Sequence, residues 1–265
     1  MTSRPSARRR ALDARLGLVR PDTPAASARM ISLPPVVAWL IGTMVLVFVV
    51  GVVLPGRASV RLDYALGFVP VRFTVLTAQG HAASPAAWGP LFGHTFLHGN
   101  FLHLAINSLG LAAFGAGVAR RLGADGRGVG AVRGVSAFLA FYFACGVAGA
   151  LAFAAANPRE ATLLVGASGA ISGLMAAAMR FALRAFAPYG PAYGPLARAS
   201  SGPVLTASLL YLGLNALTAL GMTVGASGGL SIAWEAHVGG YLFGLFSFPL
   251  FDRLAGRQDA AVPGA

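Results

Sequence analysis

The chain has 265 residues, of which 56% are hydrophobic and only 11% are charged, and its mean hydropathy is +0.70. Soluble domains average about 25% charged residues, so this composition excludes an ordinary soluble protein and indicates an integral membrane protein. The net charge is +12, and all 20 basic residues are arginines. The positions of these arginines are better explained by the orientation of the protein in the membrane, and by contact with lipid headgroups, than by nucleic-acid binding. The single cysteine, Cys145, lies in an apolar run, which excludes a disulfide framework.

The two ends of the chain differ in composition from its body. Residues 1–33 are rich in Arg, Ser, Pro and Ala, and we expect a disordered, basic, cytoplasmic tail. Residues 253–265 form a second, short cytoplasmic tail, which leaves 34–252 as the membrane domain. The first apolar run follows a long arginine-rich segment and is long enough to span a bilayer, so a cleavable signal peptide is not expected.

Six apolar segments have the length of a membrane span. Each has about 17–22 residues, close to the ~20 that a ~30 Å hydrocarbon core requires. In lipid, only helices satisfy their own backbone groups without closing a barrel. We therefore predict an all-α polytopic membrane protein with six transmembrane helices. The segments run over Val36–Leu54, Phe101–Ala119, Val135–Ala156, Leu163–Met179, Val204–Val224 and Ile232–Phe251.

The link between the first two segments, at 55–95, is long. Long loops in compact proteins usually carry structure or function of their own. We expect part of this link to lie in the membrane interface, anchored by aromatic residues such as Trp88.

Arginines are distributed unequally between the two sides of the predicted bundle. Sixteen of the twenty fall in the two tails and in the links between spans two and three and between spans four and five. Basic residues concentrate on the cytoplasmic side of a membrane. We therefore expect both termini in the cytoplasm of a multi-pass protein in a bacterial inner (plasma) membrane, with Ser168 near the outer face. The other side has only Arg57, Arg61, Arg72 and Arg159.

The tetrapeptide at 166–169, Gly-Ala-Ser-Gly, places Ser168 at the start of the fourth span. Polar groups inside a membrane are costly and suggest function. Serine needs a base to become a strong nucleophile, while a helix N-terminus favours a developing oxyanion. The alternative is that Gly166, Gly169 and Gly173 form a small-residue face for helix packing. The string is not the Gly-x-Ser-x-Gly elbow of soluble hydrolases.

A histidine in the last span is a candidate base for this serine. Gly240 and Gly244 follow His237 by three and seven residues, so they share its helical face and allow another helix to approach closely. The alternative is a packed histidine that bonds to a neighbouring helix. Glu235, only two residues from His237, should point elsewhere.

His103 and Asn107 in the second span are four residues apart and point to the same side of a helix. Both side chains can donate hydrogen bonds, to a reacting group or simply between helices. His94 and His98 precede them and could bind a metal. The His-Glu-x-x-His string of metalloproteases is absent, however, and no acidic residue lies near them in the run, so we expect no metal.

Together these motifs resemble a known family. Residues 92–117, FGHTFLHGNFLHLAINSLGLAAFGAG, are similar to the second span of rhomboid intramembrane serine proteases. The tetrapeptide at 166–169 resembles their catalytic serine motif on span four. The pattern Ala-His-x-x-Gly-x-x-x-Gly at 236–244 resembles their catalytic histidine motif on span six. The order and spacing of the motifs agree, and the resemblance covers roughly residues 34–252.

The resemblance implies a six-helix bundle with a water-filled cavity open to the outer face. It implies a catalytic dyad without an aspartate and without a cofactor. The oxyanion donors would be the Ser168 backbone N–H and two side chains of span two. The implied site residues are Ser168 and His237 as the dyad, His103 and Asn107 at the oxyanion, and His98, Gly166, Gly169 and Gly240 in support.

Two positions depart from the family pattern. The first extramembrane loop of the family often has a Trp-Arg pair, whereas Trp88 is followed here by Gly89. Many members have an aromatic residue four positions after the serine that stacks on the histidine, and here that position is Ser172. Another group must therefore hold His237.

The sequence thus predicts a rhomboid-type intramembrane serine endopeptidase. Its partners would be the lipid bilayer and substrates that are membrane proteins with one or few spans. It would cut these substrates near the outer face. Nucleic acid is not an expected partner. The main alternative is a non-catalytic rhomboid-like protein that binds membrane helices, which should lack the serine or the histidine. A small transporter is disfavoured because the sequence has no internal repeat.

Overall fold

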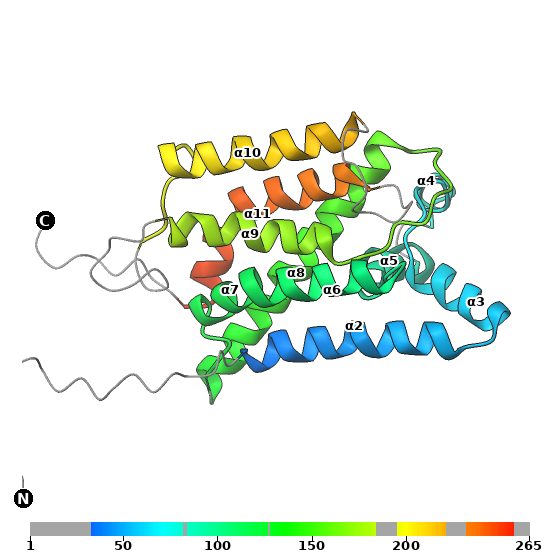
Figure 1. Ribbon diagram of the computed structural model, residues 1–265, viewed down its shortest axis with the longest axis horizontal. Coiled ribbons are helices and arrows are strands. Elements are labelled where there is room, and N and C mark those ends of the chain that lie inside the picture. Colours follow the sequence, from blue (N-terminus) through cyan, green and yellow to red (C-terminus); the bar gives the residue numbers. More distant parts are fainter. Residues whose placement is uncertain (1–32, 82–83, 127, 184–194, 221–231, 257–265) are drawn as a thin grey trace, which may run out of the picture. The chain divides into compact units, whose positions relative to one another are not determined.

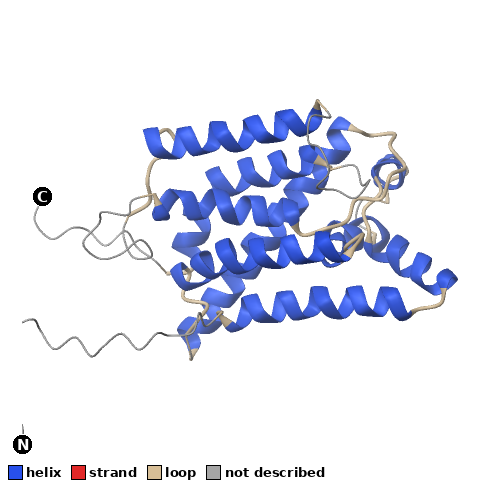
Figure 2. Ribbon diagram, in the orientation of Figure 1, coloured by secondary structure: helices blue, strands red, loops and turns tan. Residues whose placement is uncertain are grey.

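The computed structural model describes residues 33–81, 84–126, 128–183, 195–220 and 232–256, which are coloured in Figure 1. Of the two predicted tails, these ranges include only residue 33 and residues 253–256, and α11 extends to Leu254. Within the described ranges the regular structure is helical, with one isolated β-bridge and no strand (Figure 2). The predicted all-α class is therefore confirmed.

Helices occupy the positions of all six predicted spans (Figure 1). The second span is continuous but contains a π-helical turn, η2, between α6 and α7. The elements are α2 (Pro35–Val53), α6 (Phe101–Gly110), η2 (Leu111–Gly115), α7 (Ala116–Arg121), α8 (Val129–Ala156), α9 (Ser168–Ala182), α10 (Gly202–Ala219) and α11 (Trp234–Leu254).

Four of these spans are long and apolar enough to cross a membrane: α2, the α6–η2–α7 span, α8 and α10. The remaining two, α9 and α11, differ from them in length or polarity. α9 has 15 residues, ten of them buried, and α11 has acidic side chains near both ends. Both lie among other helices, since the closest packing in the described chain is between α8, α9 and α11.

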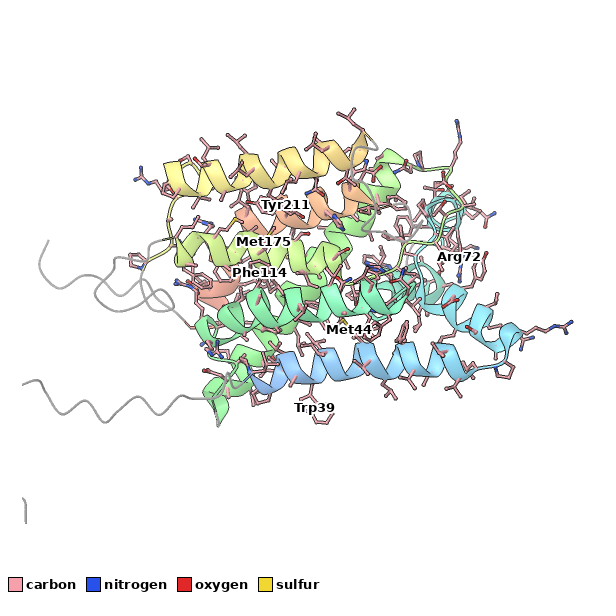
Figure 3. All side chains as sticks on the ribbon, viewed as in Figure 1. Trp39, Met44, Arg72, Phe114, Met175 and Tyr211 are labelled. Carbon is pink, nitrogen blue, oxygen red and sulfur yellow. The ribbon has the colours of Figure 1, made fainter. Side chains whose placement is uncertain are left out.

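The core fills the space between these helices with large apolar side chains. Phe138 and Phe141 of α8 and Phe248 of α11 are fully buried, and the Phe141 and Phe248 rings lie 5.2 Å apart. On the other side of the core, Met44 of α2 is also fully buried. Figure 3 shows Met44 pointing into the bundle and Trp39 of the same helix pointing away from it.

The outer faces of α2 and α10 are apolar and exposed. Trp39 is 76% exposed, and Leu209 and Leu214 on α10 are 62% and 63% exposed. Soluble monomers rarely expose apolar surface of this extent. A lipid environment accounts for it, in agreement with an integral membrane protein.

The link at 55–95 carries three helices, α3 (Gly56–Leu66), α4 (Pro70–Ala78) and α5 (Pro85–Gly93), followed by the 3₁₀ turn η1 (His94–Phe96). Of the two alternatives for a long loop, structure or function of its own, the link thus has structure. Trp88 lies on α5 and is 46% exposed, and its placement in the membrane interface stays a prediction.

Candidate active site

Ser168 is the first residue of α9, five residues after the start of the predicted span. The residues before it lie outside the helices and are tied to the first link by backbone hydrogen bonds. Phe68 and Leu164 exchange N–H···O bonds of 3.1 and 2.7 Å, and the Gly166 N–H donates to the His94 carbonyl at 2.8 Å. This pairing competes with helix formation and delays the start of α9 until Ser168.

Gly166 makes the turn into α9 with φ of +113°, a conformation that side-chain-bearing residues rarely adopt. A β-carbon there would also lie 2.6 Å from Nε2 of His103 and 3.9 Å from Nδ2 of Asn107. The side-chain nitrogens of both predicted donors therefore face the backbone just before Ser168. Glycine is required at this position for both reasons.

The Ser168 hydroxyl and the His237 imidazole meet directly. Oγ of Ser168 lies 2.8 Å from Nε2 of His237, although the two residues are 69 positions apart on different helices. Both residues are half-buried. This is hydrogen-bonding distance for a nucleophile and its base.

Glycines allow α9 and α11 to approach closely enough for this contact. A β-carbon on Gly240 would overlap the Gly169 carbonyl oxygen, and one on Gly169 would lie 3.1 Å from the Ala236 carbonyl oxygen. A β-carbon on Gly149 of α8 would lie 2.5 Å from the same Ala236 carbonyl oxygen. The small residues thus form a packing face, and that same face brings Ser168 and His237 together.

The second ring nitrogen of His237 contacts a residue that the sequence reasoning missed. Nδ1 lies 3.2 Å from Oδ1 of Asn215, a buried side chain on α10. An asparagine side chain is costly inside a membrane span, and this could have singled out Asn215 in the sequence. Glu235 points elsewhere, as predicted, and its Oε1 accepts from Nδ2 of Asn157 at 2.9 Å.

At Ser172, where many family members have an aromatic residue, a tyrosine from α10 approaches instead. The Tyr211 hydroxyl lies 2.7 Å from Oγ of Ser172, which donates to the Ser168 carbonyl at 2.6 Å. The Tyr211 ring stacks on that of Tyr241, with centroids 4.5 Å apart (Figure 3 labels Tyr211). Sequence reasoning missed both tyrosines, because their pairing joins two different helices.

His103 and Asn107 lie on one face of α6, as predicted. Nδ2 of Asn107 donates to the His103 carbonyl at 2.9 Å, and Asn100 caps the helix by accepting from the His103 N–H at 2.8 Å. The His98 ring packs edge-on against His103, with centroids 5.1 Å apart. His98 therefore contacts the site from the start of the second span, where the sequence placed it.

His94 bonds within the first link, where its Nδ1 lies 3.0 Å from the Pro90 carbonyl oxygen. The part of the chain that the structure describes contains no cluster of three or more His, Cys, Asp or Glu side chains able to hold a metal ion. The expectation of a metal-free site stays a prediction. The arrangement presents a hydroxyl, an imidazole bonded to it, and two further hydrogen-bond donors beside the same turn, which are the groups that acyl transfer requires.

The family model of the rhomboid domain matches residues 85–252, from the start of α5 to the last turns of α11. No match to a curated protein was found. The matched region is more than half of the chain, and it contains the serine, the histidines and the asparagines described above. With the helical bundle and its apolar outer faces, this match shows that the chain belongs to the rhomboid family.

Proposed function

We propose that this protein is an intramembrane serine endopeptidase, with Ser168 as the nucleophile and His237 as the general base. The observation that supports this most strongly is the 2.8 Å contact between Oγ of Ser168 and Nε2 of His237. Family members without activity would be expected to lack one of these residues, and both are present and in contact. A non-catalytic membrane-helix binder is therefore the less favoured reading.

The reaction proceeds in two halves. Oγ of Ser168 attacks the carbonyl carbon of a peptide bond while Nε2 of His237 takes the hydroxyl proton. The tetrahedral intermediate collapses, the C–N bond breaks, and the imidazolium gives its proton to the leaving amine. Water then attacks the acyl-enzyme with His237 again as base, which releases the new carboxyl end and restores the Ser168 hydroxyl.

The negative charge on the intermediate needs donors already in place. We assign the Ser168 backbone N–H at the start of α9 and the side chains of His103 and Asn107 to this role. Support comes from Gly166, beside which both side-chain nitrogens lie. Donors of this kind act mainly in the transition state, because charge develops on the oxygen only there.

The substrates would be membrane proteins with one or few spans, cut near the outer face. A peptide bond inside a helix is shielded by the helix itself, so the substrate must unwind locally before Ser168 reaches it. Glycine and other weak helix formers near the cut should favour unwinding. Replacing them by leucine in a cleaved substrate should slow cleavage, and an unchanged rate would remove this element of the proposal.

The proposed function is tested with purified protein in detergent and in proteoliposomes, using a labelled single-span substrate. A fluorophosphonate probe, which reacts with activated serines, provides a readout that does not depend on the substrate. Wild type should cleave and be labelled, whereas Ser168→Ala and His237→Ala should do neither. The double variant should be no worse than either single one, since the two residues act as a unit.

Two outcomes would overturn the proposal. Near-normal cleavage by Ser168→Ala would exclude Ser168 as the nucleophile. A wild type that binds membrane helices but neither cleaves them nor reacts with the probe would establish the non-catalytic reading. Unfolding curves of all variants are the control, because alanine packs well at small-residue helix contacts and should leave the fold intact.

A further inference from the structure

We propose that Asn215 is a positioning residue for His237, and that the Ser168–His237 pair is competent only while α10 holds Asn215 in place. The proposal deepens the function proposed above and takes from it the role of His237 as the base. Asn215 acts through the imidazole and does not touch the reacting atoms. The base would therefore be oriented by a third helix, in place of a carboxylate.

The orientation of the Asn215 amide follows from its neighbour. The Tyr211 backbone carbonyl can only accept a hydrogen bond, so the amide atom 2.9 Å from it must be the donor Nδ2. Oδ1 is then the atom that faces His237 Nδ1 at 3.2 Å. A fixed backbone acceptor thus decides which way the amide points.

The tautomer of His237 follows from the amide. Oδ1 can only accept, so Nδ1 of His237 must carry the hydrogen. A neutral imidazole has a single N–H, which leaves Nε2 with a free lone pair 2.8 Å from Oγ of Ser168. This is the tautomer that a general base for Ser168 needs.

The remaining hydrogen bonds close a ring that begins and ends at Ser168. Oγ of Ser172 donates to the Ser168 carbonyl, so the Tyr211 hydroxyl must donate to Ser172. Each hydroxyl proton, the imidazole N–H and one of the two Asn215 amide protons then have one assigned acceptor in the ring. Two of the five members, Tyr211 and Asn215, come from α10.

α10 is the least buried of the four long apolar helices, and its main contacts are with α9 and α11. Its opposite face exposes leucines such as Leu209 and Leu214. A displacement of α10 would remove Asn215 from Nδ1 without moving Ser168 or His237. His237 would then no longer be held in a single tautomer whenever α10 separates from α11.

The test compares three substitutions on α10. Asn215→Leu keeps the size of the side chain but removes the acceptor. Asn215→Asp keeps an acceptor for Nδ1 but cannot donate to the Tyr211 carbonyl. Ser208→Ala is the matched control, since Ser208 is equally buried and bonds α10 to Tyr241 of α11 at 2.7 Å, away from His237.

For Asn215→Leu we expect kcat to fall by about 10- to 100-fold with little change in KM, a part of the roughly 10²- to 10⁴-fold that a positioned base contributes. Asn215→Asp should be more active than Asn215→Leu, and Ser208→Ala should stay within about threefold of wild type. If Asn215 only held α10 in the bundle, the order would reverse, because a carboxylate is far costlier than leucine in a membrane helix.

A second measurement separates failure of this proposal from failure of the proposed function. Ring ¹⁵N NMR of His237 reports its tautomer whether or not the protein cleaves anything. We expect a protonated Nδ1 in wild type and in Ser208→Ala, and a mixture of tautomers in Asn215→Leu. An active wild type whose tautomer and kcat are unchanged in Asn215→Leu would overturn the role of Asn215. An inactive wild type with the expected tautomer would overturn only the protease assignment.

Discussion

Gly240 of α11 lies so close to Gly169 of α9 that a β-carbon at position 240 would overlap the Gly169 carbonyl oxygen. Gly169 directly follows Ser168, and Gly240 lies one turn after His237. The spacing of the two helices at this contact therefore sets the distance between the hydroxyl and the imidazole. Packing and the proposed chemistry depend on the same pair of residues.

Gly240→Ala should push α9 and α11 apart. We expect a loss of stability of about 1–3 kcal/mol, which is typical of overpacking. Fluorophosphonate labelling of Ser168 should slow by more than about tenfold, since small misplacements of catalytic groups are costly. Thermal unfolding in detergent and the labelling rate measure the two effects.

The matched control is Gly213→Ala on α10, where a β-carbon would meet nothing within 4 Å. Alanine is the better helix former by about 1 kcal/mol, so this variant should be as stable as wild type or more so, with normal labelling. Equal behaviour of the two variants would contradict the role given to the contact between Gly240 and Gly169.

Asn107→Ala should lower kcat by roughly 10- to 1000-fold, at or below the loss typical of one oxyanion donor. KM should move little, because the hydrogen bond forms mainly in the transition state. His103→Ala should behave similarly, and residual activity should remain because the Ser168 N–H is still present. Steady-state kinetics with a single-span substrate measures both constants.

Chelators provide the control against a metal mechanism at His94, His98 and His103. We expect no loss of activity in their presence. Inactivation by chelators and recovery with zinc would overturn the serine mechanism, since a catalytic metal must be bound for turnover.

The sequence predicted the spans well because apolar length is a local property. It placed the start of the fourth span at Leu163, whereas α9 begins at Ser168. The difference comes from the pairing of Leu164 with Phe68, a contact across almost a hundred residues that no local pattern contains. The structure of the first link was foreseen only in general terms, and its helices α3, α4 and α5 were not located.

The candidate site was predicted where residues resemble a motif, and missed where they do not. Ser168, His237, His103 and Asn107 were named from the sequence, and the structure brings Ser168 into contact with His237. Asn215 was missed because a single asparagine in an apolar segment gives no partner until the helices are packed. The sequence also did not show which group stands at Ser172 in place of the family's aromatic residue. That group, Tyr211, approaches from another helix, so only the packed structure reveals it.

A buried ion pair joins the second and last spans of the bundle. Arg121 and Asp252 form a two-pronged ion pair, with Nη2–Oδ2 at 2.7 Å and Nε–Oδ1 at 2.9 Å. The guanidinium also lies 5.2 Å from the centroid of the Phe181 ring. In the sequence, Arg121 served only as one of the arginines that predict a cytoplasmic link between spans two and three.

Asp252→Ala should destabilise the protein by about 3–5 kcal/mol, because it leaves a buried arginine without its carboxylate. The double variant Arg121→Leu/Asp252→Leu should lose less than Asp252→Ala, since no charge is then left unpaired. Arg253→Ala, at the exposed neighbouring position, is the control and should change stability by less than about 0.5 kcal/mol. Unfolding of the four proteins in one detergent tests the order, and a double variant worse than Asp252→Ala would refute it.

The orientation in the membrane can be tested without reference to catalysis. The native cysteine, Cys145, is fully buried, so a Cys145→Ala background allows single cysteines to be placed at exposed positions. Arg57 on α3 and Arg253 on α11 are both exposed and belong to opposite sides in the predicted topology. Cysteine at 57 should react with a membrane-impermeant maleimide in intact cells, and cysteine at 253 only after permeabilisation. Because Phe68 of the first link pairs with Leu164, just before Ser168, labelling at 57 also reports the side on which the serine lies. The reverse labelling pattern would place the serine at the cytoplasmic face and contradict cleavage near the outer face.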